Sequence, residues 1–73
     1  MIIEDFNGSL NGVDLIAKNL TADIEEVNNG VIFKFMCDDF TTEHFIEKEC
    51  YNLIFGEKEY SSVVLSVLDS ISH

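Results

Sequence analysis

Residues 22–37 read ADIEEVNNGVIFKFMC, and this stretch predicts a β-hairpin. Asn29-Gly30 is typical of a type I′ turn, because both central residues of that turn need positive φ. On either side of it, apolar and polar residues alternate with the period of two that separates the faces of a strand. We therefore expect two paired strands, over about 21–28 and 31–38.

The alternation divides the hairpin into two faces. A turn centred on Asn29-Gly30 pairs Glu25 with Lys34, which would place opposite charges across the strands. The expected core face carries Ala22, Ile24, Val31, Phe33, Phe35 and Cys37. The expected solvent face carries Asp23, Glu25, Lys34 and Asp38, with Val27, Ile32 and Met36 among them.

Two helices are expected after the hairpin, over about 42–55 and 59–72. Thr41 or Thr42 suits the N-cap of the first helix, and Gly56 is a natural stop at its end. The second helix is predicted by apolar residues at helical spacing, namely Tyr60, Val63, Val64, Val67, Leu68 and Ile71. A second hairpin around Gly56, formed by residues 50–55 and 60–68, remains an alternative.

The segment before the hairpin is expected to hold a short strand and a short helix. Met1 to Phe6 suits a strand, Asn7-Gly8-Ser9 a turn, and Ser9 to Asn19 a helix. The fold class predicted for residues 1–73 is therefore α+β, a single small domain in which the hairpin packs against two C-terminal helices.

Charge is the most informative feature of the composition. The 73 residues hold 14 acids against four lysines and no arginine, a formal charge of -10. Hydrophobic residues make up 47% of the chain and include six phenylalanines, which excludes a disordered acidic tail. Such a surface repels nucleic acid and anionic lipid. The chain has no basic leader, no apolar run of about 20 residues and only two cysteines, so we expect a reduced protein of the cytoplasm.

Motifs for catalysis or metal binding are absent from the sequence. Cys37, His44 and Cys50 lack the spacing of a zinc site, and on the expected helix His44 and Cys50 point apart. The run from Asp5 to Asn11 begins like a calcium loop but lacks its glycine and its final glutamate. We therefore predict a non-enzymatic chain without catalytic, cofactor or metal residues. The last residue, His73, is expected to fray.

The carboxylates remain as the candidate binding feature. On the expected helix Glu43 and Glu47 lie one turn apart on one face. One candidate acidic row contains Asp38, Asp39, Glu43, Glu47, Glu57 and Glu59. A second candidate patch contains Asp23, Glu25 and Glu26. Either set presents repeated negative charge, as DNA does, to a groove built for phosphates.

In size and charge, and without any matching motif, the chain resembles small acidic phage-encoded host-takeover proteins. Many members of that group are DNA mimics, and the resemblance implies an inhibitor that blocks the basic DNA-binding site of a nuclease, CRISPR effector, sliding clamp or polymerase in the host cytoplasm. An immunity or antitoxin protein, or an adaptor that binds through an apolar helix face, is the alternative. That face, which could also form a homodimer, comprises Val63, Val64, Val67, Leu68 and Ile71. The same residues are better explained as core, because so short a chain needs every apolar face to fold.

Overall fold

The computed structural model describes residues 1–72 and contains a four-stranded antiparallel sheet followed by two helices. The predicted α+β fold is therefore confirmed, and His73 lies outside the described residues. Neighbouring strands in the sheet are also neighbours in the chain. The elements are β1 (Ile2–Leu10), β2 (Val13–Val27), β3 (Gly30–Cys37), β4 (Phe40–Glu47), α1 (Lys48–Phe55), the short 3₁₀ turn η1 (Tyr60–Ser62) and α2 (Val64–Ile71).

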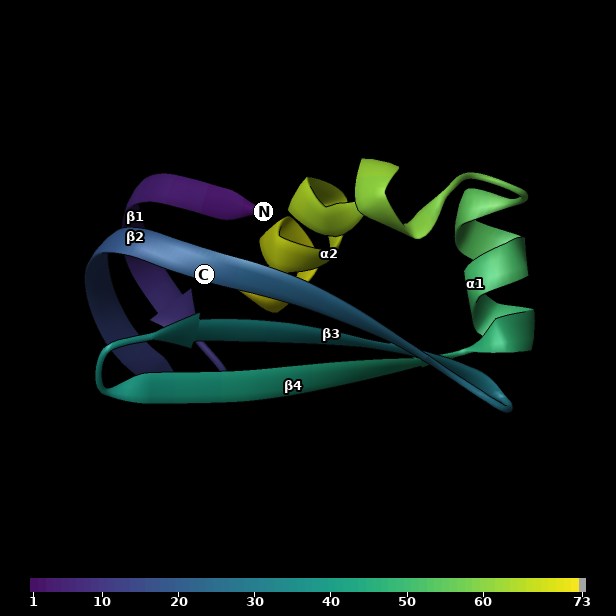
Figure 1. Ribbon diagram of the computed structural model, residues 1–73, viewed down its shortest axis with the longest axis horizontal. Coiled ribbons are helices and arrows are strands. Elements are labelled where there is room, and N and C mark those ends of the chain that lie inside the picture. Colours follow the sequence, from purple (N-terminus) through teal and green to yellow (C-terminus); the bar gives the residue numbers. More distant parts are fainter. Residues whose placement is uncertain (73) are drawn as a thin grey trace.

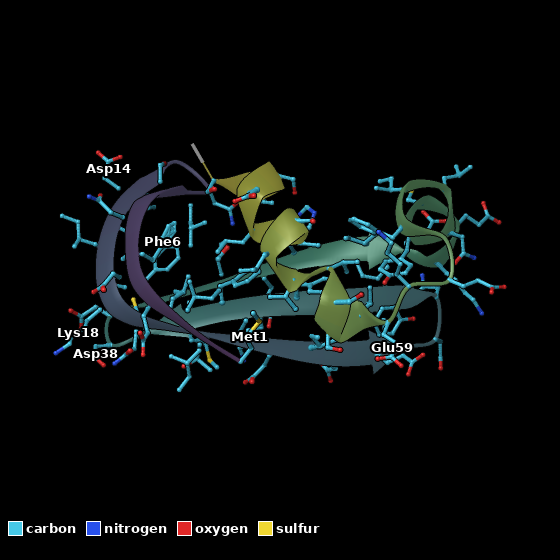
Figure 2. All side chains as sticks on the ribbon, turned by 90° about the horizontal axis from the view of Figure 1, so that it is seen from above. Met1, Phe6, Asp14, Lys18, Asp38 and Glu59 are labelled. Atoms are coloured by element: carbon cyan, nitrogen blue, oxygen red, sulfur yellow. The ribbon has the colours of Figure 1, made fainter. Side chains whose placement is uncertain are left out.

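Both helices lie on the same side of the sheet, and the opposite side is open (Figure 1). At the end away from α1, β1 and β2 curve out of the plane of β3 and β4 and bend round the side that holds α2 (Figures 1 and 2). We call the side facing the helices the inner face and the open side the outer face. The core lies between the inner face and α2.

The curvature coincides with a distortion in β1 and β2. Asp5 has a positive φ of 55°, and its pairing with Lys18 is missing from an otherwise regular ladder. The alternation of buried and exposed residues also shifts by one residue at this point. On β2 the buried residues Leu20 and Ala17 are three positions apart, and on β1 the buried Phe6 follows the same point. Each strand therefore turns its apolar side chains inward both before and after the bend.

The predicted helix from Ser9 to Asn19 is wrong, because this segment is a hairpin. Asn11 and Gly12 have φ values of 51° and 82° and form the two-residue turn between β1 and β2, as a type I′ turn requires. The helical spacing that suggested a helix comes from the phase change in β2, which places buried Ala17 and Leu20 three residues apart.

The central hairpin exists, but its predicted register is wrong by two residues. The turn is Asn28-Asn29, and Gly30 is the first residue of β3, paired with Val27. A shift of two leaves every side chain on its predicted face, because side chains alternate with a period of two. The expected Glu25–Lys34 pairing is therefore replaced by Asp23 opposite Lys34.

The predicted helix over about 42–55 is half wrong, because Phe40–Glu47 is β4 and only Lys48–Phe55 is helical. In β4, Thr42 and Ile46 are buried, and the residues that alternate with them are exposed, as expected for an edge strand with one covered face. The N-cap is Glu47 rather than Thr41 or Thr42. The predicted stop at Gly56 is confirmed: it has a φ of 68°, and its N–H donates to the Asn52 carbonyl at 3.0 Å.

The last predicted helix is present in shortened form, as η1 and α2, and the alternative second hairpin is wrong. Its apolar stripe belongs to the core. The exposed fractions are 2%, 1%, 1% and 7% for Val63, Val64, Val67 and Leu68, and Ile71 packs against the same cluster. These side chains are already covered by the sheet, so they are not available as a dimer surface in this fold.

Two contacts tie the β1–β2 turn to the rest of the molecule. Leu10, which is fully buried, forms an isolated bridge with Ser72 just after α2. The Asn11 side-chain amide donates to the Thr42 hydroxyl on β4. The first contact fixes the turn to the chain just after α2, and the second fixes it to the edge strand β4.

Candidate protein-binding face

All fourteen acidic side chains of the chain are exposed. Within residues 1–72 one carboxylate lies within ion-pair distance of a lysine: Glu43 Oε1 is 3.9 Å from Lys34 Nζ. An exposed pair of this kind contributes little to stability, about 0–1 kcal/mol. Most of the negative charge therefore lies on the surface without a lysine paired to it.

The structure separates the predicted partner-binding acids into three places. The outer face of the sheet holds Asp23 and Glu25 from β2 and Glu43 and Glu47 from β4. The turn between β3 and β4 holds Asp38 and Asp39, which line a hollow with Lys18 at the end opposite α1 (Figure 2). A pocket beside α1 is lined by Glu26, Glu57 and Glu59.

The outer face brings together members of both predicted acidic sets. Asp23 and Glu43 lie opposite Lys34, one from each side, because all three occupy one row across the sheet. The next row contains Glu25, Ile32 and Phe45. Because both lie on strand β4, Glu43 and Glu47 are about 14 Å apart, at a rise of about 3.4 Å per residue, rather than one helical turn apart.

An apolar centre lies among these carboxylates. Phe45 has 47% of its surface exposed and lies beside the half-buried Ile32. Half-buried Val27 and Met36 extend this apolar strip along the outer face. The outer face therefore combines four carboxylates and one lysine with an exposed aromatic ring at its β4 edge. Protein interfaces commonly combine apolar anchors with a polar rim in this way.

Phe45 is not among the predicted binding residues, because residues 42–55 were expected to form a helix. The signal that could have identified it is the alternation of Thr41, Glu43, Phe45 and Glu47 against Thr42, His44 and Ile46. Read with a period of two, that stretch is a strand whose phenylalanine lies on the polar face.

The pocket beside α1 contains a cluster of aromatic rings. The ring centroid of Tyr51 lies 5.0 Å from that of Phe55 and 4.9 Å from that of Tyr60, the latter edge-to-face. The Tyr51 hydroxyl donates to the Lys58 carbonyl at 2.6 Å, and the Tyr60 hydroxyl donates to Glu26 Oε1 at 3.4 Å. The pocket has a volume of about 370 Å³ and also contains two lysines, Lys48 and Lys58.

Both tyrosines have a raised pKa. Burial raises the pKa of Tyr51, and the neighbouring phenol of Tyr60 adds to the effect. Burial also raises the pKa of Tyr60, reinforced by the negative charge of Glu26 and the hydrogen bond to it. Both phenols are therefore neutral at physiological pH and act as hydrogen-bond donors.

A third hollow, of about 420 Å³, lies between β4, α1 and α2. Its lining includes His44, Cys50, Ile54, Phe55 and Val67. The predicted separation of His44 from Cys50 is therefore corrected: because His44 lies on a strand and not on the helix of Cys50, both residues line the same groove. Cys37 lies elsewhere, beside Asp38, and both thiols are free.

Across the described residues, no group of three or more His, Cys, Asp or Glu side chains is arranged to hold a metal ion. The Asp5 to Asn11 run, which begins like a calcium loop, is strand β1 and the start of its turn. Likewise, no helix in residues 1–72 is long and apolar enough to cross a bilayer.

The chain matches no family model, no curated protein and no solved structure.

Proposed function

We propose that this chain is a non-enzymatic inhibitor whose outer sheet face binds and blocks a basic, nucleic-acid-binding surface on another protein. The supporting observation is that Asp23, Glu25, Glu43 and Glu47 lie on the same open face as the exposed Phe45. The carboxylates attract a cationic partner, and the aromatic ring supplies apolar surface that is buried on binding.

The spacing of the acids suits a surface that normally holds phosphates. Along β2, Asp23 and Glu25 are two residues and about 7 Å apart, and β2 lies about 10 Å from β4 across the sheet. One DNA strand advances about 3.4 Å along the helix axis per nucleotide, so these separations correspond to roughly two to three nucleotides. Asp38 and Asp39, in the turn that joins β3 to β4, add further negative charge at one end of these strands.

Two matched variants test the proposal. The face variant carries Asp23→Asn, Glu25→Gln, Glu43→Gln and Glu47→Gln. The control variant carries Asp14→Asn, Glu57→Gln, Glu59→Gln and Asp69→Asn, all exposed positions away from that face. Each variant removes four of the fourteen acids, so the two have equal net charge.

The immobilised chain is used to capture proteins from a cell lysate, which are eluted separately with rising salt and with duplex DNA. We expect the captured protein to bind nucleic acid, to be released by either eluent, and to bind the face variant at least about 30-fold more weakly than the control. Equal binding by the two variants, or capture that resists both salt and DNA, contradicts the proposal.

A second candidate is an immunity, antitoxin or adaptor protein that binds through apolar contacts. The predicted helix stripe is buried in the core, but α1 exposes Leu53 and Ile54 at 87% and 68%. Binding through that helix would persist in high salt and would be lost in Leu53→Ser/Ile54→Ser, whereas the acidic face variant would bind normally.

A further inference from the structure

Strand β4 is an open edge of the sheet. It is the last strand in the order, and among the described residues no strand pairs with its outer side. The other edge, β1, is partly covered by the bridge between Leu10 and Ser72. Edge strands are commonly protected by charged side chains, especially lysine, by proline or by a bulge. The eight residues FTTEHFIE of β4 contain no lysine and no proline, and their register with β3 is unbroken. Their charged side chains are the two acids Glu43 and Glu47.

One contact shows which residues of β4 direct their backbone N–H and C=O groups toward β3 and which direct them toward the open edge. The Lys48 N–H donates to the Asn29 carbonyl at 2.9 Å, which extends the ladder by one hydrogen-bonded pair. Because such pairs alternate along an antiparallel ladder, Thr42, His44 and Ile46 direct their backbone groups to β3. The remaining residues, Thr41, Glu43, Phe45 and Glu47, direct their N–H and C=O groups to the open edge.

The two sides of this edge differ in chemistry. The residues with free backbone groups place their exposed side chains, including Glu43 and Glu47, on the outer face. On the inner side lies the groove lined by His44, Ile54 and Val67. An extended segment paired with β4 would point alternate side chains into the groove and toward the carboxylates.

Charge determines which occupant fits. A second copy of this chain paired edge to edge would bring Glu43 and Glu47 against their own counterparts, with a formal charge of -10 on each molecule. Like charges directly opposite one another are destabilising. A cationic segment meets the same carboxylates favourably.

We infer that β4 accepts an extended segment of a basic protein as a fifth strand, with apolar residues in the groove alternating with lysine or arginine beside Glu43 and Glu47. This mode of β-strand addition draws affinity from backbone hydrogen bonds and specificity from alternate side chains. The inference rests on the proposed function, because it names the way in which the basic partner is held.

Synthetic peptides added to the unmodified protein test it. The probe is an eight-residue peptide alternating lysine and valine, which matches the eight residues of β4. Three controls accompany it: the same composition as a block of lysines then valines, an alternating glutamate–valine peptide, and the probe N-methylated at every second residue on its pairing edge. Affinity is measured by fluorescence anisotropy, and backbone amide exchange by NMR.

We expect the alternating cationic peptide to bind and to protect the amides of Thr41, Glu43, Phe45 and Glu47, which exchange fast in the free protein. Methylation should weaken binding at least about tenfold, because each methyl removes a backbone donor. Weaker binding by the block and glutamate peptides also supports the inference.

The inference and the proposed function fail differently. Salt-sensitive binding of the cationic peptide without new amide protection, or without any effect of methylation, overturns strand addition and leaves charge-driven binding intact. Equal binding of the glutamate peptide overturns the electrostatic basis of both. A dimer of the free protein with these four amides already protected shows that a second copy occupies the edge, which also overturns the inference.

A protein variant gives an independent check. In Glu43→Pro the lost N–H points away from β3, so the ladder keeps its bonds, but the edge loses a donor. Glu43→Gln removes the same charge and keeps that donor. Strand addition requires the proline variant to bind the cationic peptide at least about tenfold more weakly than the glutamine variant; equal affinity in two folded variants overturns it.

Discussion

The ring of Phe45 on β4 lies directly over Gly30 on β3. A Cβ atom at Gly30 would lie 2.7 Å from Cε1 and 2.8 Å from Cζ of that ring, and it would also collide with the carbonyl oxygen of Ile46. The aromatic ring therefore covers backbone that a larger residue would displace. This packing holds the Phe45 ring against the Gly30 backbone, within the proposed binding surface.

Gly30→Ala should destabilise the protein by about 1–3 kcal/mol. The new methyl group would clash with the Phe45 ring and with the Ile46 carbonyl oxygen, and the latter is backbone and cannot rotate away. Urea unfolding followed by circular dichroism measures the change. Asn29→Ala, an exposed position in the adjoining turn, is the control and should change stability by less than about 0.5 kcal/mol. A Gly30→Ala variant as stable as the control would show that Phe45 and β4 move aside freely.

Gly30 also explains why the central hairpin was predicted in the wrong register. The sequence contains Asn-Gly three times, at Asn7-Gly8, Asn11-Gly12 and Asn29-Gly30, and only Asn11-Gly12 forms a type I′ turn with two positive φ angles. Asn7-Gly8, where a turn was expected, lies inside β1. At Asn29-Gly30 the glycine is required by packing rather than by the turn. Because that packing depends on Phe45, fifteen positions away in a strand that was expected to be a helix, local propensity could not distinguish these dipeptides.

Other features were predictable because they depend on local periodicity. The faces of β2 and β3, the stop at Gly56 and the buried stripe of the C-terminal helix follow from spacings within a few residues. The bend at Asp5 and Lys18 was not predictable, since the strands change phase there and mimic the spacing of a helix. The exposure of the acids could be predicted from composition. Their meeting on one face could not, because it depends on which strands are neighbours.

Stability should rise with salt. The molecule is 32 Å long, and the Debye length falls from about 30 Å at 10 mM salt to about 8 Å at 150 mM. At low salt, repulsion therefore acts between exposed acids across the whole molecule, whereas at physiological salt it acts only between neighbours. The melting temperature measured by calorimetry should increase over that range of sodium chloride. The control variant with four neutralised acids should show a smaller increase, and a flat melting temperature for the unmodified chain would contradict the electrostatic account.

Lys34→Gln should cost up to about 1 kcal/mol. Lys34 is the cation between Asp23 and Glu43 in one row of the sheet, and it lies 3.9 Å from the Glu43 carboxylate. Its removal leaves the two acids facing one another across β3. Denaturation at low and physiological salt should show a larger loss at low salt, and Lys34→Arg should retain most of the stability. A loss independent of salt would indicate that the aliphatic stem of Lys34, rather than its charge, contributes the stability.

Alkaline pH should destabilise the fold through Tyr51. Because its pKa is raised in the folded protein above the ordinary value of about 10, the folded state holds its proton more tightly than the unfolded state. The resulting stability is fully present below about pH 10 and is lost as pH rises through the folded pKa. Chemical denaturation from about pH 8 to about pH 11 should therefore show a steady fall in unfolding free energy at the upper end.

Tyr51→Phe separates this effect from other titrations in the same range. At about pH 8 the variant should be less stable by about 1 kcal/mol, because it loses the hydrogen bond to the Lys58 carbonyl. Its alkaline loss should be smaller than that of the unmodified chain, since the buried phenol no longer ionises. Tyr60→Phe is the matched control, with a more exposed hydroxyl bonded to Glu26. Tyr51→Phe and the unmodified chain could instead lose stability in parallel above about pH 10. Tyr51 would then have the same pKa in the folded and unfolded states, and its hydroxyl would not be buried against the Lys58 carbonyl in solution.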